Sequence, residues 1–518
     1  MKRISATIAL MSCAFTSAAL AQENSTACSA LAQWTGPVAQ SPLDLRIDEA
    51  RFYEARSIEG PGGGQTLPPH CHVTGSFEHR TGIDDVEYAI RFAVNLPESW
   101  NGRYLFQGGG GLNGSVREPI GAGAAGSVSG LARGFAVVST DSGHSGPGFD
   151  GSFMNDQLAL LNFQFLANAK TTEVTRPMVA AYYGEPPQRS YFVGCSTGGR
   201  EGMIMAQRHP QLFDGIVSGA PAMRTTISNL ALRWISNQYV GVADTNARDP
   251  FTDAEESLIM GALMNTCDAL DGQADGLIFN RESCDFDPRA LSCSANPGAA
   301  VGQQCLADGK AAALARSMGG PLNAAGQPVY VSYPWDSGID DKVGLPGLLT
   351  AGGSPPIGPN GADMASQDVD AEFLDAIATN EALGSTAGNY NVSSFIDGGG
   401  KQIFYHGEAD PWFSANDTVR YFERLGETNA AVASREDYTR LYLVPGMAHC
   451  AGGEQTVDMF DLLTPIVEWV ENGVSPDAVV ATGNSMPGVS RPLCPWPSYA
   501  HFVGDDSTQA GSYECRMP

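Results

Sequence analysis

The sequence predicts an α/β fold with a mostly parallel sheet and a large inserted lid domain. Short apolar runs alternate with helical segments from about residue 78 to 219, and such alternation is typical of a parallel sheet covered by helices. This alternation of strands and helices stops near residue 222 and resumes at residue 401. The region between them is rich in Gly, Pro and Ala and holds four cysteines. We therefore expect a core domain over 22–222 and 400–518, with a lid domain over 223–399.

The expected strands and helices follow from local patterns. Gly134–Ser139 and Ser190–Gly194 are apolar runs of the kind that form buried parallel strands, whereas Tyr88–Leu96 alternates. The helix after residue 200 should end before Pro210. The expected strands are 88–96, 104–107, 134–139, 190–194, 213–218, 401–405 and 439–444, and the clearest helices outside the lid are 201–209 and 459–472.

The N-terminus is typical of a secretory signal peptide over residues 1–21. Lys2 and Arg3 precede an apolar stretch too short to span a membrane, and Ala19-Leu20-Ala21 forms an A-x-A cleavage site. An imperfect lipoprotein box ending at Cys13 is the alternative interpretation. We expect a secreted or periplasmic protein without a membrane span.

Cysteine content and charge fit an exported protein. Cleavage after Ala21 removes Cys13 from the eleven cysteines and leaves an even ten, which is typical of disulfide-bonded exported chains. Closeness in sequence suggests the pairs Cys28–Cys71, Cys267–Cys284, Cys293–Cys305 and Cys494–Cys515. Cys195 then remains for Cys450. The net charge of −27 argues against nucleic acid or an anionic membrane surface as a partner.

The segment Gly194-Cys195-Ser196-Thr197-Gly198 carries the first chemical signal. It fits G-x-S-x-G, follows an apolar strand and precedes a helix, which is the context that holds a nucleophilic serine on a sharp turn. The small flanking residues leave room for that turn. A glycine-rich turn without chemistry is the alternative. We expect Ser196 to be a nucleophile.

A serine nucleophile needs a histidine base and an acid that orients it. In the chain order serine, acid, histidine, His449 is the best of the eight histidines because it follows the last strong strand and stands beside Cys450. His406 is interpreted as structural. The expected acid is Asp410, with Glu408 as the alternative.

An oxyanion hole needs backbone N–H groups. One is expected from Thr197, directly after the nucleophile, and the other from the loop Gly108–Gly111, at Gly109 or Gly110. This loop lacks the lysine and the spacing of a phosphate cradle. We expect no organic cofactor.

The segment from Cys267 to Ile278 has the composition of a calcium loop. Three aspartates within eight residues alternate with glycines that permit tight turns, and Ca²⁺ takes carboxylate and carbonyl oxygens. The expected ligands of a structural Ca²⁺ are the side chains of Asp268, Asp271 and Asp275 and the carbonyls of Gln273 and Leu277. A solvated series of Asp-Gly turns is the alternative.

Together, Cys195-Ser196, Asp410 and His449-Cys450 resemble the CS-D-HC motif of the tannase/feruloyl esterase family. The segments 405–410, 443–450 and 491–495 are also similar to segments of that family. The resemblance implies an α/β-hydrolase core with a lid, a Cys195–Cys450 disulfide and the calcium site named above. It also implies a serine carboxylesterase that hydrolyses esters of aromatic acids.

The substrate is expected to be selected in the lid. Tyr333-Pro-Trp335-Asp336 resembles a lid segment of terephthalate monoester hydrolases, so Trp335 is expected to face the aromatic ring. Residues 343–349 lack the tryptophan- and arginine-bearing stretch by which such enzymes grip a free carboxylate, and no Lys or Arg lies between Lys342 and Lys401. Neutral feruloyl, hydroxycinnamoyl or galloyl esters are therefore the main expectation, and mono(2-hydroxyethyl) terephthalate is the alternative. An inactive binding module and an acyltransferase are competing classes.

Overall fold

The computed structural model describes residues 25–36, 44–58, 64–243, 247, 249–341, 348–349, 367–382 and 388–518. The expected signal peptide, Cys13 and most of the 343–349 stretch lie outside the described residues. The chain divides into two compact units. The first holds Met1–Gly123, Ser127–Gly148 and Ser152–Phe192, and the second holds Ala124–Gly126, Phe149–Gly151 and Val193–Pro518.

Nine strands form the main sheet. In spatial order they are β1 (Arg46–Tyr53), β4 (His70–Thr81), β5 (Glu87–Pro97), β7 (Ala136–Thr140), β6 (Arg103–Gln107), β8 (Arg189–Cys195), β9 (Gly215–Gly219), β10 (Lys401–Gly407) and β11 (Thr439–Val444). The pairs β6–β7, β9–β10 and β10–β11 are parallel, whereas β1, β4, β5 and β7 pair antiparallel at one end. The predicted α/β fold with a mostly parallel sheet is confirmed.

The first unit packs helices on its part of the sheet. The long helix α3 (Ala167–Tyr183) lies against β5 and β7. In the interior of this unit, the hydroxyl of Tyr104 in β6 lies 2.8 Å from Oγ1 of Thr175 in α3. The Cys28–Cys71 disulfide attaches the N-terminal segment to β4. Its other elements are α2 (Gln157–Leu161) and the hairpin strands β2 (Arg56–Ile58) and β3 (Gln65–Leu67).

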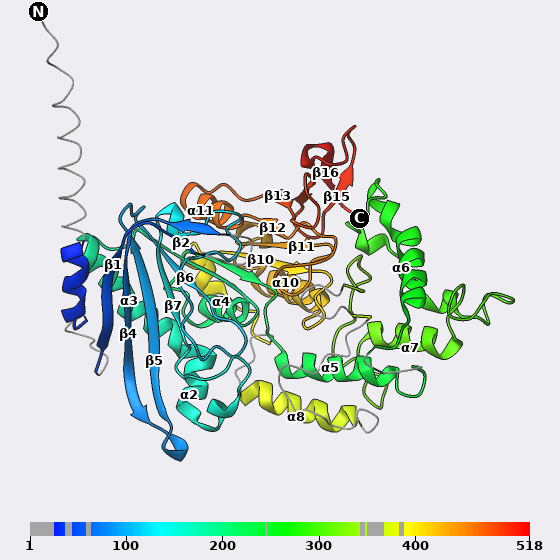
Figure 1. Cartoon of the computed structure of the whole chain (residues 1–518), viewed down its shortest axis with the longest axis horizontal. Coiled ribbons are helices and arrows are strands. Elements are labelled where there is room, and N and C mark those ends of the chain that lie inside the picture. The colour runs from blue at the N-terminus through cyan, green and yellow to red at the C-terminus, as the bar shows by residue number, and fades with distance from the viewer. Residues whose placement is uncertain are drawn as a thin grey trace, which may run out of the picture. The chain divides into compact units, whose positions relative to one another are not determined.

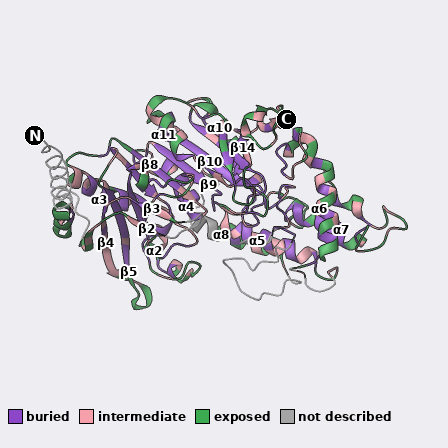
Figure 2. Cartoon of the chain, turned by 45° about the horizontal axis from the view of Figure 1, so that its top comes forward, coloured by how far each residue is buried: buried purple, intermediate pink, exposed green. Residues whose placement is uncertain are grey.

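In the second unit, the strands β9, β10 and β11 are almost wholly buried, as Figure 2 shows for β9 and β10. The helices that contact them are α4 (Thr197–Arg208), α10 (Ala415–Asn429) and α11 (Leu463–Asn472). The sequence predicted strands over 401–405 and 439–444, and the structure has β10 and β11 there. The centres of both strands are apolar, as burial on both faces favours.

The 223–399 segment contributes helices with a hydrophobic core of their own. They are α5 (Thr225–Gln238), α6 (Asp253–Cys267), α7 (Asp308–Gly319), α8 (Val369–Ala382) and the short α9 (Ser393–Asp397). Figure 1 shows α5 to α8 as a group beside β10 and β11. Their shared core includes Ile259, Leu314 and Tyr330, and the buried Lys310 Nζ lies 2.7 Å from Glu255 Oε2.

One predicted helix begins later than expected. Residues 459–472 were predicted as one helix, but Met459–Phe460 forms strand β12 and α11 begins at Leu463. Met459 and Phe460 pair with Thr482 and Ala481 of β13 (Val479–Thr482), so tertiary pairing overrides the local pattern. The remaining C-terminal strands are β14 (Ser490–Leu493), which pairs with β13, and the hairpin of β15 (Tyr499–Phe502) and β16 (Tyr513–Arg516).

Candidate active site

Ser196 occupies the tight turn between β8 and α4. Its backbone has φ 63° and ψ −122°, a combination that costs energy in a residue with a side chain and that is characteristic of functional sites. The turn has no room for larger neighbours, because a Cβ on Gly199 would lie 2.2 Å from the carbonyl oxygen of Gly219. The Ser196 N–H donates to that same carbonyl at 3.0 Å. The predicted strand–turn–helix setting of the nucleophile is therefore present.

Asp410 and His449 are in direct contact. Asp410 lies just beyond β10, and its Oδ2 is 2.7 Å from His449 Nδ1, in the loop after β11. Its Oδ1 accepts the backbone N–H groups of Trp412 at 2.9 Å and of Phe413 at 3.1 Å. The carboxylate is therefore held on one side by its own turn and on the other by the histidine.

The environment keeps Asp410 ionised. Its burial is complete, and burial acts to raise the pKa of a carboxyl group. The adjacent His449 and His406 act in the opposite direction and hold the pKa of Asp410 well below its usual range. An ionised Asp410 can only accept hydrogen bonds, so His449 Nδ1 carries the hydrogen.

The second nitrogen of His449 is the one free to take a proton. With Nδ1 protonated, Nε2 keeps its lone pair, and this atom is buried without a hydrogen-bond partner among the described residues. The ring lies between aromatic neighbours, with centroids 5.0 Å from Trp412 and 5.3 Å from Phe413. His449 thus has the tautomer and the support that a general base requires.

A disulfide joins the residues beside the candidate nucleophile and base. Cys195 and Cys450 are 255 residues apart in sequence, and their Cα atoms lie 5.9 Å apart. Because consecutive Cα atoms are about 3.8 Å apart, the Cα atoms of Ser196 and His449 lie within about 14 Å. The other disulfides of the described chain join the same pairs that sequence proximity suggested, Cys28–Cys71, Cys267–Cys284, Cys293–Cys305 and Cys494–Cys515.

The expected oxyanion donors lie in different units. Thr197 is the first residue of α4 and is buried. Gly109 and Gly110 belong to the first unit, where a Cβ would meet the side chains of Asn113 and Arg117, respectively. Their position relative to Ser196 stays a prediction.

Two further residues near Asp410 were weighed in the sequence. His406 was interpreted as structural, and its Nε2 lies 3.2 Å from Asp410 Oδ2. Glu408, the alternative acid, has its Oε1 3.7 Å from Arg281 Nη1, and burial raises its pKa to about 8. No spacing in the sequence indicated the contact between His406 and Asp410, because it depends on the turn after β10.

Asp336 was quoted from the sequence only as part of a similar segment. It is fully buried, and its Oδ1 accepts the N–H of Gly446 at 2.9 Å. Gly446 begins the loop that carries His449. No pattern in the sequence connects two residues 110 positions apart, so this support was missed.

Trp335 lines a cavity of about 280 Å³ together with Arg281, Tyr333 and Asn416. Its ring meets Phe286 edge-on, with centroids 4.9 Å apart. None of the three triad candidates is among the described residues that line this cavity. The contact of Trp335 with a substrate ring stays a prediction.

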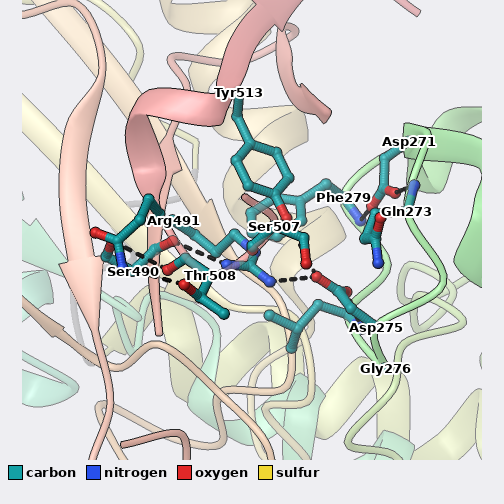
Figure 3. Close-up of polar contacts among 12 residues, drawn as sticks. Asp271, Gln273, Asp275, Gly276, Phe279, Ser490, Arg491, Ser507, Thr508 and Tyr513 are labelled. Carbon is teal, nitrogen blue, oxygen red and sulfur yellow. Dashed lines mark hydrogen bonds and ion pairs between the residues drawn. The ribbon is translucent and has the colours of Figure 1, made fainter. Parts of the chain in front are cut away.

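The predicted calcium loop lies against the C-terminal strands (Figure 3). Burial, together with the neighbouring carboxylates of Asp275 and Asp268, raises the pKa of Asp271 to about 7. Asp275 forms an ion pair with the buried Arg491 of β14, whose guanidinium also stacks over Tyr513.

Within the described residues, no group of three His, Cys, Asp or Glu side chains is arranged as a metal site. The donor set nevertheless suits a hard cation, because the Asp275 carboxylate is close enough to help raise the pKa values of Asp268 and Asp271. Ca²⁺ binding by this loop, with Gln273 and Leu277 as carbonyl donors, stays a proposal.

Comparison with known proteins identifies the family. The model of the family "Tannase and feruloyl esterase" matches residues 71–354 and 359–516. The chain belongs to the tannase and feruloyl esterase family. It is 34% identical to the mono(2-hydroxyethyl) terephthalate hydrolase of Piscinibacter sakaiensis over 561 residues, which cover 95% of this chain and 92% of that protein. It is 28% identical to feruloyl esterase B of Aspergillus niger, with 81% and 82% covered.

Membership makes the chain a carboxylic ester hydrolase of the tannase/feruloyl esterase family. The structure is also similar to the crystal structure of feruloyl esterase B from Aspergillus oryzae, with a TM-score of 0.78 and 24% identity, covering 95% of this chain and 100% of that one. At 24% identity, this structural similarity shows the fold alone.

The Cys195–Cys450 disulfide should support activity more than a disulfide elsewhere does. By the chain-entropy argument, closing a loop of this length stabilises the fold by about 5 kcal/mol, but the bond also holds Ser196 near His449. We expect Cys195→Ser with Cys450→Ser to lose more kcat/KM than Cys494→Ser with Cys515→Ser. The measurement is ester hydrolysis at a temperature where circular dichroism shows both variants folded. Equal losses would contradict a special role of the Cys195–Cys450 disulfide in activity.

Proposed function

We propose that this esterase hydrolyses esters of aromatic acids through Ser196, His449 and Asp410. The observation that carries the proposal is the Asp410–His449 contact at 2.7 Å, on a loop joined by a disulfide to the residue before Ser196. The unpartnered Nε2 of His449 is where a serine proton would go. The strained turn at Ser196 is the setting that a nucleophile of this type needs.

The reaction follows from these roles. His449 Nε2 takes the proton of Ser196, and the serine oxygen attacks the ester carbonyl carbon. Backbone N–H groups, with Thr197 and Gly109 or Gly110 as the proposed donors, stabilise the oxyanion. The alcohol leaves with the proton from His449. Water then attacks the acyl-enzyme by the same route and releases the acid.

Among aromatic substrates, we place monoesters of the mono(2-hydroxyethyl) terephthalate type first. The relative with that name matches 95% of this chain at 34% identity, whereas feruloyl esterase B matches 81% at 28%. Aromatic rings beside the base suit an aromatic acyl group, because Trp412 packs on His449 and contacts the half-exposed Phe149. The 223–399 segment, with Trp335, is proposed to select the ester.

Neutral feruloyl and galloyl esters are the second candidate. The observation that favours them is the absence of Lys and Arg between Lys342 and Lys401. A substrate with a free carboxylate is usually bound by a cationic side chain. The partly buried Arg281, which lines the same cavity as Trp335, is a cation that the chain offers from outside that stretch.

The protein is proposed to act in an oxidising compartment, as a secreted or periplasmic enzyme. Five disulfides support this assignment. In the part of the chain that the structure describes, no helix has the length and apolar character needed to cross a membrane.

Replacement of Ser196 by Ala should lower kcat by at least about 10³-fold, as removal of a triad member does in other serine hydrolases. A fluorophosphonate probe should label the wild-type protein once, and labelling should vanish in Ser196→Ala. Ser76 offers a matched control, because its Oγ lies 3.0 Å from His79 Nε2, whose Nδ1 lies 3.0 Å from Asp44 Oδ2. Ser76→Ala should keep both labelling and turnover. Normal turnover by Ser196→Ala would refute the mechanism.

A substrate panel should decide between the two ester classes. We expect kcat/KM for mono(2-hydroxyethyl) terephthalate to exceed that for methyl ferulate, methyl gallate and chlorogenate. Monomethyl and dimethyl terephthalate form a matched pair that differs only in the free carboxylate. A preference for the diester and the phenolic esters would support the second candidate and contradict the first.

Calcium should stabilise the fold without taking part in the reaction. Because carboxylates must be ionised to bind the ion, and the pKa of Asp271 is raised to about 7, we expect calcium to raise Tm more at pH 8 than at pH 5.5. At a hundredfold excess over Kd the gain is about 2.7 kcal/mol. Asp271→Asn should abolish the calcium-dependent shift in differential scanning calorimetry, while Asp253→Asn, at an exposed position of α6, should keep it. A wild-type Tm unaffected by EGTA and calcium would rule the site out.

A further inference from the structure

A second histidine contacts the carboxylate of the proposed triad acid. His406 lies in β10 and has no exposed surface. Its Nε2 is 3.2 Å from Asp410 Oδ2 and 2.9 Å from the carbonyl oxygen of Phe413. Its Nδ1 is 2.8 Å from Thr418 Oγ1 in α10. The ring therefore bridges three structural elements: its own strand, the turn after it and the helix that follows.

The neighbours of His406 determine its tautomer. Nε2 faces two oxygens, and both the ionised Asp410 and the Phe413 carbonyl can only accept hydrogen bonds. Nε2 must therefore carry a hydrogen. Nδ1 faces the Thr418 hydroxyl, which can donate to it, so the ring satisfies all its partners in the neutral form.

We infer that His406 is a positioning residue for the reaction, which holds Asp410 in place for His449. Both ends of the turn 410–413 are attached to its Nε2, the acid through Oδ2 and Phe413 through its carbonyl. The same turn supplies the Trp412 and Phe413 rings that pack on His449. His406 thus orients the carboxylate and the aromatic support of the base together.

This inference rests on the proposed function, and it adds an expectation about the proton affinity of Asp410. The ionisable groups that face Asp410 are His449, His406, Tyr330 and Tyr333. Burial raises the pKa of Tyr330 to about 12 and holds the pKa of Tyr333 well above its ordinary value, so both tyrosines stay neutral. Among these groups, His406 and His449 are the two whose ring N–H groups stabilise the ionised form of Asp410.

The test compares two substitutions that keep different halves of the imidazole. In His406→Gln, the side-chain N–H₂ can reach the place of Nε2 and donate to Asp410. In His406→Asn, the shorter amide can reach only the place of Nδ1. We expect His406→Asn to lower kcat by at least about tenfold, since small displacements of catalytic groups are costly, and to leave KM within about twofold. His406→Gln should recover most of the lost kcat.

The pH profile separates positioning from mere stabilisation. Loss of a donor to an ionised carboxylate raises the proton affinity of the Asp410–His449 pair. The acid limb of kcat/KM should therefore move to higher pH in His406→Asn and return toward the wild-type position in His406→Gln. A purely structural histidine would lower Tm and the active fraction, measured by fluorophosphonate titration, without moving the limb. His70→Asn is the matched control, because His70 is equally buried and contacts the Pro68 carbonyl.

The outcomes are distinguishable from failure of the proposed function. If Ser196→Ala remains active, the proposed function fails. If Ser196→Ala is inactive and folded His406→Asn keeps the wild-type kcat and acid limb, only the role of His406 is overturned. Should His406→Asn not fold, Thr418→Val removes the partner of Nδ1. Lower kcat in that variant would support the inference, and wild-type kcat with an unmoved acid limb would overturn it.

Discussion

The site depends on the hydrogen bonds that the fully buried carboxylate of Asp410 accepts. A charge without exposed surface is tolerated only when its oxygens are hydrogen-bonded. Here Oδ1 accepts hydrogen bonds from two backbone N–H groups of its own turn, and Oδ2 accepts hydrogen bonds from the rings of His449 and His406. The donors come from the ends of β10 and β11, which pair in parallel up to Gly407 and Val444. The register of two strands therefore determines whether the acid meets the base.

Backbone pairing also connects these strands with the candidate nucleophile. Ser196 donates its N–H to Gly219 at the end of β9, and Gly219 pairs with Tyr405 of β10. Hydrogen bonds between backbones thus connect the turn of Ser196 with the strand that precedes Asp410. The disulfide between Cys195 and Cys450 adds a covalent connection to the loop of His449. A strained turn can persist when its surroundings determine it in this way.

Sequence patterns predicted the parts of the fold that are local. The β10 and β11 runs, the serine turn and the pairing of cysteines close in sequence all depend on neighbouring residues. The start of α11 was predicted four residues early, because Met459 and Phe460 pair with β13, and no local pattern reports a distant partner. The contacts of His406 with Asp410, Phe413 and Thr418 were not predicted for the same reason, because they depend on how the chain turns after β10. Contacts between residues of a recognisable motif, such as Asp410 with His449 and Cys195 with Cys450, were predictable. Contacts outside any motif, such as those of His406 and Asp336, were not.

Asp336 connects the 223–399 segment with the loop that carries His449. This buried residue belongs to the 223–399 segment, and it accepts the N–H of Gly446 at the start of the loop that carries His449. Its neighbour Trp335 lines a cavity with Arg281. The segment proposed to select the substrate is therefore hydrogen-bonded to the loop of the base. A change at Asp336 or Trp335 would therefore act on the cavity and on the loop of His449 together, so in this protein we expect substrate choice and turnover to be coupled through these two residues.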